Sequence, residues 1–101
     1  RFSGWCFDRV RHVLIDPTGD MLPLSSAEYR LFDALTAHPA RVLSRERLLE
    51  LTRAPGVDVN DRSIDLAVSR LRKKLGDSQR DGRLIRTVRG EGYLFDSKAS
   101  W

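Results

Sequence analysis

The segment of residues 61–75, DRSIDLAVSRLRKKL, constrains the fold of this chain more than any other part of it. Its main apolar residues recur at i, i+4, i+7 and i+11, which places them in one narrow stripe along an α-helix. These residues are Ile64, Val68, Leu71 and Leu75. The opposite side of the same helix carries Arg62, Leu66, Ser69 and Lys73, with Arg70 beside them. The pattern predicts a helix that packs on a core along one side and presents cations on the other.

The positive charge of the chain is concentrated around this helix. The 101 residues carry a net charge of +4, and the sequence pI is about 9.8. Residues 60–90 hold nine Lys and Arg against four Asp, whereas the rest of the chain holds nine basic against ten acidic residues. Such clustering is expected of a surface that binds nucleic acid. A membrane surface fits less well, because the helix lacks a Trp-, Phe- and Leu-rich face to insert into lipid.

The remaining composition limits the other function classes. Cys6 is the single cysteine, so the chain has neither an internal disulfide nor a Cys-based metal site, and a reducing cytoplasm is favoured. His12 and His38 are isolated, and no phosphate-binding loop or dinucleotide motif occurs. We therefore expect no catalytic activity, no metal and no cofactor.

Length and ends indicate one domain, residues 1–101, excised from a longer protein. The chain is large enough for one core and too small for two. It begins at Arg1 without an initiator Met, and it has neither a secretion leader nor an apolar run of the roughly 18 residues that span a membrane.

The flanking segments predict a sheet before the helices and a hairpin after them. Strands are expected within residues 2–24, around a turn at 16–20 that contains Pro and Gly. Ser25 and Glu28 match a capping box, which predicts a helix from there to His38, before Pro39. A second helix is expected from Ser44 to just before residue 55, and residue 60 or 61 would cap the third. Residues 84–88 and 93–95 would pair around a turn with two glycines, which completes an α+β chain.

Two motifs in this order, RSID with SRLRKKL over residues 62–75 and TVRGEGY over residues 87–93, are specific in combination. Together they resemble the signature of OmpR/PhoB-type response-regulator effector domains. Residues 2–5, 24–28 and 41–45 are also similar to that family, so the resemblance covers nearly the whole chain. It implies a winged helix-turn-helix fold with a four-stranded N-terminal antiparallel sheet, a three-helix core and a C-terminal hairpin as the wing.

The resemblance also implies a function, which is sequence-specific binding of double-stranded DNA by the output domain of a bacterial two-component regulator. Helix 61–75 would enter the major groove and wing 84–95 the minor groove, and two copies would bind tandem half-sites about one helical turn apart. A cognate histidine kinase would phosphorylate a receiver domain that precedes this chain. RNA polymerase would contact the loop with Pro55, Gly56, Val57 and Asp58. The isolated domain is expected to be a monomer that dimerises on DNA.

The resemblance assigns DNA contacts residue by residue. Arg70 matches the arginine that reads a base, since its fork suits guanine O6 and N7, and Leu66 matches a position that meets thymine methyl groups. Arg89 matches the wing arginine in the minor groove. The phosphate-contacting positions are Arg62, Arg72, Thr87 and Tyr93, and Lys73 would meet a phosphate or a base edge. Ser69 completes the DNA-facing set.

Three further positions carry expectations. Ala67 and Ser69 stand where some family members have longer polar or basic side chains, which implies fewer direct contacts from the middle of the helix. Lys74 lies to the side of the helix and is expected to be solvated.

A second interpretation is a winged helix that binds a protein without specific DNA binding. Each predicted contact taken alone could be an ordinary exposed polar group, and an acidic protein surface could satisfy the same charges. Arg70 and Arg89 on two elements about a groove's width apart favour DNA. Duplex RNA is excluded by its deep and narrow major groove.

Overall fold

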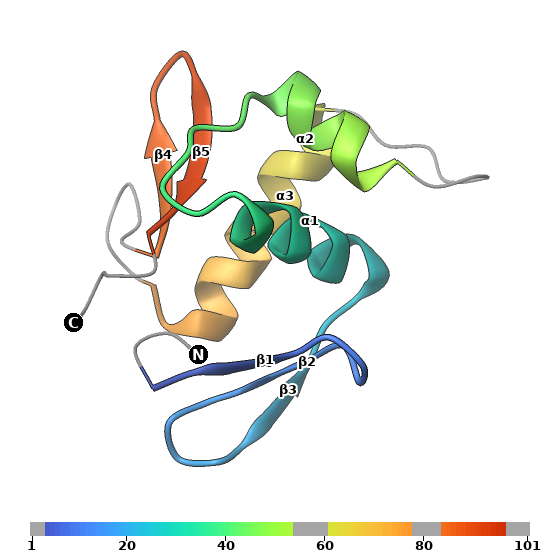
Figure 1. Cartoon of the computed structure of the whole chain (residues 1–101), viewed down its shortest axis with the longest axis vertical. Helices are drawn as coiled ribbons and strands as arrows, with labels where there is room; N and C mark the ends of the chain where they lie inside the picture. Colours follow the sequence, from blue (N-terminus) through green and yellow to red (C-terminus); the bar gives the residue numbers. More distant parts are fainter. Residues whose placement is uncertain (1–3, 54–60, 78–83, 97–101) are drawn as a thin grey trace.

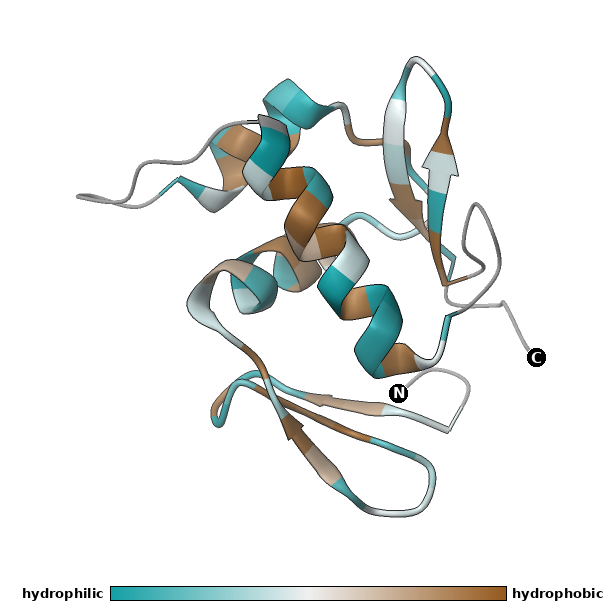
Figure 2. Ribbon diagram, turned by 180° about the vertical axis from the view of Figure 1, so that it is seen from behind, coloured by the Kyte–Doolittle hydropathy of each residue, from teal (hydrophilic) through white to brown (hydrophobic). Residues whose placement is uncertain are grey.

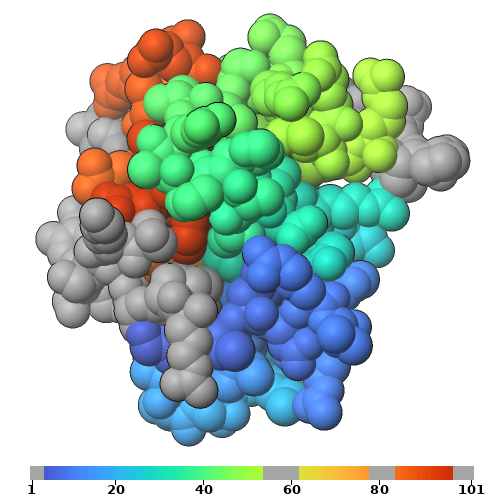
Figure 3. All heavy atoms as spheres, in the orientation of Figure 1, coloured from blue at the N-terminus to red at the C-terminus, as the bar shows by residue number. Residues whose placement is uncertain are grey.

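The elements of the chain lie in three layers, in the order sheet, helices, hairpin (Figure 1). The computed structural model describes residues 4–53, 61–77 and 84–96. The strands and helices are β1 (Cys6–Asp8), β2 (Val13–Ile15), β3 (Met21–Pro23), α1 (Ser26–Ala37), α2 (Arg45–Thr52), α3 (Asp61–Leu75), β4 (Ile85–Val88) and β5 (Gly92–Phe95). In the space-filling view the three layers are in contact, with the sheet at one end and the hairpin at the other (Figure 3).

The N-terminal sheet is antiparallel with the strand order β1-β2-β3. Leu14, in the middle of β2, lies opposite Phe7 and Leu22 and is fully buried. Strand β2 begins only at Val13, because the Asp8 carboxylate accepts hydrogen bonds from two turn amides, 3.0 Å each, and holds residues 9–12 in a turn. The described residues form three strands here, not the four that the resemblance implied.

Helices α1 and α2 begin where the caps predicted. The Ser25 hydroxyl accepts from the Glu28 amide at 3.2 Å, and the Glu28 carboxylate accepts from the Ser25 amide at 2.8 Å, which confirms the capping box. Ser44 caps α2 by accepting from the Arg47 amide at 3.0 Å. Helix α3 spans the predicted residues, and its cap lies outside the described part of the chain.

The core lies where α1 and α3 meet. All four residues of the predicted α3 stripe are buried, and the most exposed of them, Ile64, is 3% exposed. Phe32 of α1 is fully buried and connects the layers, because its ring meets Phe7 of β1 edge-on at 4.8 Å and Phe95 of β5 at 5.5 Å. The sheet, the helices and the hairpin therefore share one apolar cluster.

The end of α3 is tied to the start of the hairpin. The Gly76 amide donates to Lys73 and the Asp77 amide donates to Arg72, which is the Schellman pattern of a helix end. Asp77 is 4% exposed, and its Oδ2 accepts from the amides of Leu84 and Ile85 at 3.0 and 3.1 Å. This buried carboxylate holds the first residues of the hairpin against the end of α3.

The hairpin pairs with the segment between α1 and α2 as well as with itself. Thr87 lies opposite Tyr93 in the β4–β5 ladder. On the other side of β5, Leu43 and Tyr93 exchange two backbone hydrogen bonds of 2.8 and 3.0 Å. The predicted hairpin is confirmed, with β5 beginning one residue earlier at Gly92, and it is held beside the start of α2.

Candidate nucleic-acid interface

Helix α3 carries its predicted cationic face to the surface. It runs diagonally across the face seen in Figure 2, with the hairpin along one side. The side chains that the sequence placed opposite the buried stripe are all exposed: Arg62, Leu66, Ser69, Arg70 and Lys73. Leu66 is 52% exposed, so it contributes little to the core. The two-sided helix is thus confirmed, while contacts to DNA from these residues stay a prediction.

Arg72 differs from the other predicted contacts because its guanidinium is engaged within the molecule. Nε and Nη2 donate to the carbonyl oxygen of Ile85 at 3.0 and 2.8 Å, and Nη2 donates to the Thr87 hydroxyl at 2.6 Å. The guanidinium also lies 5.7 Å from the centre of the Tyr93 ring. Arg72 therefore joins α3 to the hairpin, and its phosphate contact stays a prediction.

Tyr93 is also an internal link. It is 6% exposed, and its hydroxyl donates to Asp65 Oδ1 of α3 at 2.6 Å. Arg45 of α2 donates from Nε to the same oxygen at 2.9 Å. Burial, together with the neighbouring Asp65 carboxylate, raises the pKa of Tyr93, so the hydroxyl remains a donor at neutral pH. The side chains of Thr87 and Tyr93 thus lie between the hairpin and α3. Their expected contacts with DNA phosphates stay predictions.

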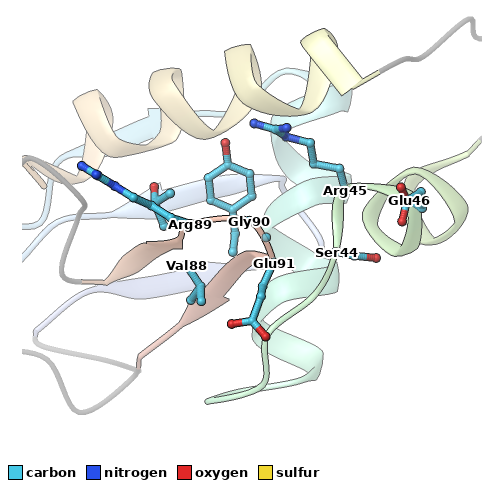
Figure 4. A pocket seen from close by; sticks show the side chains of 10 residues that line it. Ser44, Arg45, Glu46, Val88, Arg89, Gly90 and Glu91 are labelled. Carbon is cyan, nitrogen blue, oxygen red and sulfur yellow. The ribbon is translucent and has the colours of Figure 1, made fainter.

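A hollow of about 430 Å³ separates the start of α2 from the turn of the hairpin. It is lined by residues 44–46 and 87–93. In Figure 4, Arg45 and Arg89 reach from opposite walls toward α3, whereas Glu91 points away from that helix. Arg89 is exposed at the turn. One cation of α2 and one of the hairpin turn thus lie on the side of α3.

Lys74 was expected to be solvated, and this expectation is wrong, because its ammonium group is bonded within the molecule. Its Nζ donates to Glu28 Oε1 at 2.6 Å and to the carbonyl oxygen of Pro23 at 2.9 Å. Burial by itself would raise the pKa of Glu28, but the hydrogen bonds from Lys74 and the Ser25 amide outweigh it, and the pKa lies below its ordinary value. Glu28 is 3% exposed, so a buried carboxylate at the start of α1 draws the lysine inward.

The expectation for Ala67 also needs correction. Ala67 is 5% exposed and lies with the core cluster, so it is not part of the exposed face. The buried side of α3 is therefore wider than the four apolar residues that the sequence pattern identified, since it also includes Ala67. Of the two positions with short side chains, only Ser69 is exposed.

The sequence did not identify the internal partners of Arg45, Asp65 and Asp77, nor the bond of Glu28 to Lys74. A partial signal existed for Asp65, because it lies seven residues before Arg72 and therefore on the same side of α3. The others bond to partners that are distant in the sequence or that follow a loop, and no local spacing reveals such contacts.

Three further expectations concern the polymerase-contacting loop, metal binding and the membrane. The expected polymerase-contacting residues 55–58 are outside the described residues. Within the described part of the chain, no cluster of three or more His, Cys, Asp or Glu side chains could hold a metal ion. Among the same residues, no helix combines the length and the apolar character that crossing a membrane requires.

Comparison with known proteins gives a consistent family. Residues 19–95 match the family described as "Transcriptional regulatory protein, C terminal". The transcriptional regulatory protein GltR of Pseudomonas aeruginosa is 41% identical over 93 residues, which is 92% of this chain and 38% of that protein. The regulatory protein VirG of Agrobacterium fabrum is 41% identical over 96 residues, 95% of this chain. This chain spans 38% of the length of each of these relatives.

Solved structures resemble the whole chain. The RstA DNA-binding domain of Klebsiella pneumoniae, in complex with the RstA box, superimposes with a TM-score of 0.81 at 36% identity and covers 96% of this chain and 95% of its own. The DNA-binding domain of CpxR from Escherichia coli gives a TM-score of 0.76 at 32% identity, with 98% and 96% covered. The predicted winged helix-turn-helix fold is confirmed.

Proposed function

This chain belongs to the family of C-terminal domains of transcriptional regulatory proteins, and from that premise we propose that it binds double-stranded DNA sequence-specifically as the output domain of a two-component regulator. The observation that carries the proposal is the two-sided helix α3. One side is buried in the core, and the other exposes three cations, a hydroxyl and a leucine beside the hairpin. A helix of this kind fits the major groove, which is about 12 Å wide.

The contacts are those that the family resemblance implies, and the exposure of the outer side of α3 supports them. Arg70 reads a base and Leu66 meets a thymine methyl group, while Arg62 binds a phosphate and Lys73 a phosphate or a base edge. Arg89 at the exposed turn enters the adjacent minor groove. Ser69, Arg72, Thr87 and Tyr93 complete the set, the last three at the junction of α3 and the hairpin. The solved complex of the RstA domain with its box supports DNA as the partner.

The rest of the proposal concerns the longer protein. This chain is 38% of the length of the regulators GltR and VirG, which leaves room for a receiver domain phosphorylated by a histidine kinase. Two copies, monomeric when free, would bind tandem half-sites in the cytoplasm, where the DNA is. RNA polymerase would contact the segment with Pro55 and Asp58, between α2 and α3.

The experiment is selection from a randomised DNA duplex pool at several salt concentrations, followed by sequencing of the retained duplexes. We expect enrichment of a defined motif, tandem at about one helical turn, and an affinity that falls steeply with salt. A matched pool of duplex RNA should not be retained above background.

Retention without any sequence preference would contradict sequence-specific binding by this domain. It would favour the second interpretation, a winged helix whose partner is a protein. Arg11→Ala is the control for substitutions of arginines on the α3 side, because it removes the same charge elsewhere. Arg11 lies in the turn between β1 and β2, in the sheet layer away from the hairpin (Figure 1).

A further inference from the structure

Asp65 is a negative charge on the helix that is proposed to meet DNA phosphates. Its neighbours in the chain include Leu66 on the exposed face, and its own side chain is 41% exposed. A carboxylate near the DNA backbone repels phosphate and by its charge alone weakens binding. A residue of this charge at this place therefore needs a compensating role. Its hydrogen bonds indicate that role, because Oδ1 accepts both from the Tyr93 hydroxyl of β5 and from Arg45 Nε of α2. Three elements meet at this one oxygen.

The contact with Tyr93 is one of the side-chain hydrogen bonds that link α3 to the hairpin strands among the described residues. Others come from Arg72, which bonds to Ile85 and Thr87 of β4. Residues 65 and 72 are two helical turns apart on the same side of α3, a separation of about 10 Å along the axis. Their partners Tyr93 and Thr87 lie directly opposite each other in the hairpin. The backbone pairing with Leu43 and the shared core hold the hairpin in place, and these two side-chain links, one to each strand, set its angle to the exposed face of α3.

We propose that Asp65 is a positioning residue for DNA recognition, which sets the angle between α3 and the hairpin so that Arg70 and Arg89 engage neighbouring grooves together. This inference rests on the proposed function. The half-exposed ion pair with Arg45 adds little to folding. Asp65 acts through its hydrogen bonds with Tyr93 and Arg45, and it sets the orientation of the hairpin relative to α3.

The chain offers a matched control for Asp65. Asp33 of α1 accepts from Arg9 Nε at 2.9 Å, the same kind of contact and the same length as Arg45 to Asp65. The Asp33 side chain is 45% exposed, and its partner lies in the turn between β1 and β2, not in the hairpin. Asp33→Ala and Asp65→Ala therefore remove the same charge and the same type of ion pair. Only Asp65→Ala removes a hydrogen bond to the hairpin.

The first measurement is the affinity of both variants for a duplex recovered from the randomised pool. If Asp65 mattered only through its charge, its removal would tighten binding, because one repulsive carboxylate is lost. Positioning predicts the opposite sign, with Asp65→Ala binding about tenfold more weakly than Asp33→Ala. Asp65→Asn retains an oxygen that accepts from Tyr93 and should recover part of the loss. It also serves as the second variant if Asp65→Ala does not fold.

The second measurement is a double-mutant cycle with Arg89→Ala. In the unsubstituted chain we expect Arg89→Ala to weaken binding about tenfold, and in the Asp65→Ala background by only about twofold, because the hairpin is no longer aimed at its groove.

The third measurement needs no DNA. Backbone amide resonances of Val88 and Gly90 should shift in free Asp65→Ala and stay in place in free Asp33→Ala.

The outcomes separate the two proposals. If the unsubstituted chain shows no sequence preference for duplex DNA, the proposed function fails. If it selects a site but Asp65→Ala binds as tightly as Asp33→Ala, the DNA proposal stands and the positioning role is overturned. Additive effects of Asp65→Ala and Arg89→Ala, or no effect of Arg89→Ala alone, would overturn the positioning role as well.

Discussion

At the scale of single residues, the hairpin depends on a close backbone approach at Gly92. Its φ is +145°, and a Cβ built on it would lie 2.1 Å from the carbonyl oxygen of Leu43. That carbonyl accepts the hydrogen bond from the Tyr93 amide, so it cannot move away without breaking the pairing of β5. The second glycine of the RGEGY sequence is thus required by the neighbouring segment as well as by the turn.

Gly92→Ala should therefore lower the free energy of unfolding by at least about 2 kcal/mol, through backbone strain and a steric clash. Urea denaturation measures this directly. Gly90→Ala is the control, because Gly90 also has a positive φ, +76°, but a Cβ added there would have nothing within 4 Å. Its cost should be roughly 1 kcal/mol. Equal losses for the two variants would show that the approach to Leu43 is not the constraint.

Arg70 is the residue whose substitution should change sequence preference. Arg70→Ala should cost about 1–3 kcal/mol on the selected site and relax the preference at one base pair, since a bidentate contact to guanine would be lost. Affinities for the selected duplex and for its single-base variants measure both effects. Arg11→Ala removes the same charge in the sheet layer and should leave base preference unchanged. An unchanged base preference in Arg70→Ala would move the reading role to another residue.

At the scale of elements, α3 is fastened near its end to α1 and β3 through Lys74. The lysine bonds to the buried Glu28 at the start of α1 and to the Pro23 carbonyl of β3. Glu28 also caps α1, so one carboxylate holds a helix start, a helix end and, through the lysine, the edge of the sheet. Removal of the lysine would leave this carboxylate buried without its charged partner.

Lys74→Met should lower the free energy of unfolding by roughly 1–3 kcal/mol at pH 7, a discounted value because the lysine is 32% exposed. The folded-state pKa of Glu28 is depressed, so its stabilising contribution is present above the unfolded pKa and is lost as the pH falls through the folded value. The difference between Lys74→Met and the unsubstituted chain should therefore shrink once the pH falls below the ordinary Glu value of about 4.3.

Unfolding experiments from pH 7 down to pH 3 check this prediction. Lys73→Met is the control, because the Lys73 side chain is exposed and its substitution should change stability little at any pH. A Lys74→Met penalty that stayed constant across the range would show that Glu28 is not the group responsible.

At the scale of the whole molecule, the cations that α3 carries do not have equal roles. Arg62 is exposed, whereas Arg72 is bonded to the hairpin. Binding to DNA and stability of the domain are therefore separable properties of one charged surface.

Arg62→Ala should make the salt dependence of DNA affinity shallower by about one unit and leave stability unchanged, as expected for one lost phosphate contact. Arg72→Ala should weaken binding to all sequences alike and also lower the free energy of unfolding by roughly 1–3 kcal/mol, because the bonds to Ile85 and Thr87 are lost. Titrations at several salt concentrations and urea denaturation of both variants test the contrast. Equal stability of the two variants would show that the Arg72 bonds to the hairpin contribute little.

Local sequence patterns determined most of the fold. The capping box at Ser25, the stripe from Ile64 to Leu75 and the glycines of the hairpin turn each depend on residues within a few positions of one another. Helical periodicity, cap chemistry and turn geometry are properties of such short segments, so they can be predicted without knowledge of the rest of the chain. The exposed face of α3 followed from the same periodicity.

Only the tertiary structure decided which charged residues face solvent and which hold the elements together. Lys74 bonds to Glu28, 46 positions away, and Tyr93 bonds to Asp65, 28 positions away. The sequence places Lys73 and Lys74 side by side with the same charge, and their environments differ because α1 and β3 lie against only one of them. Burial and pairing depend on what a distant segment brings to the same place, and helical periodicity carries no information about that segment.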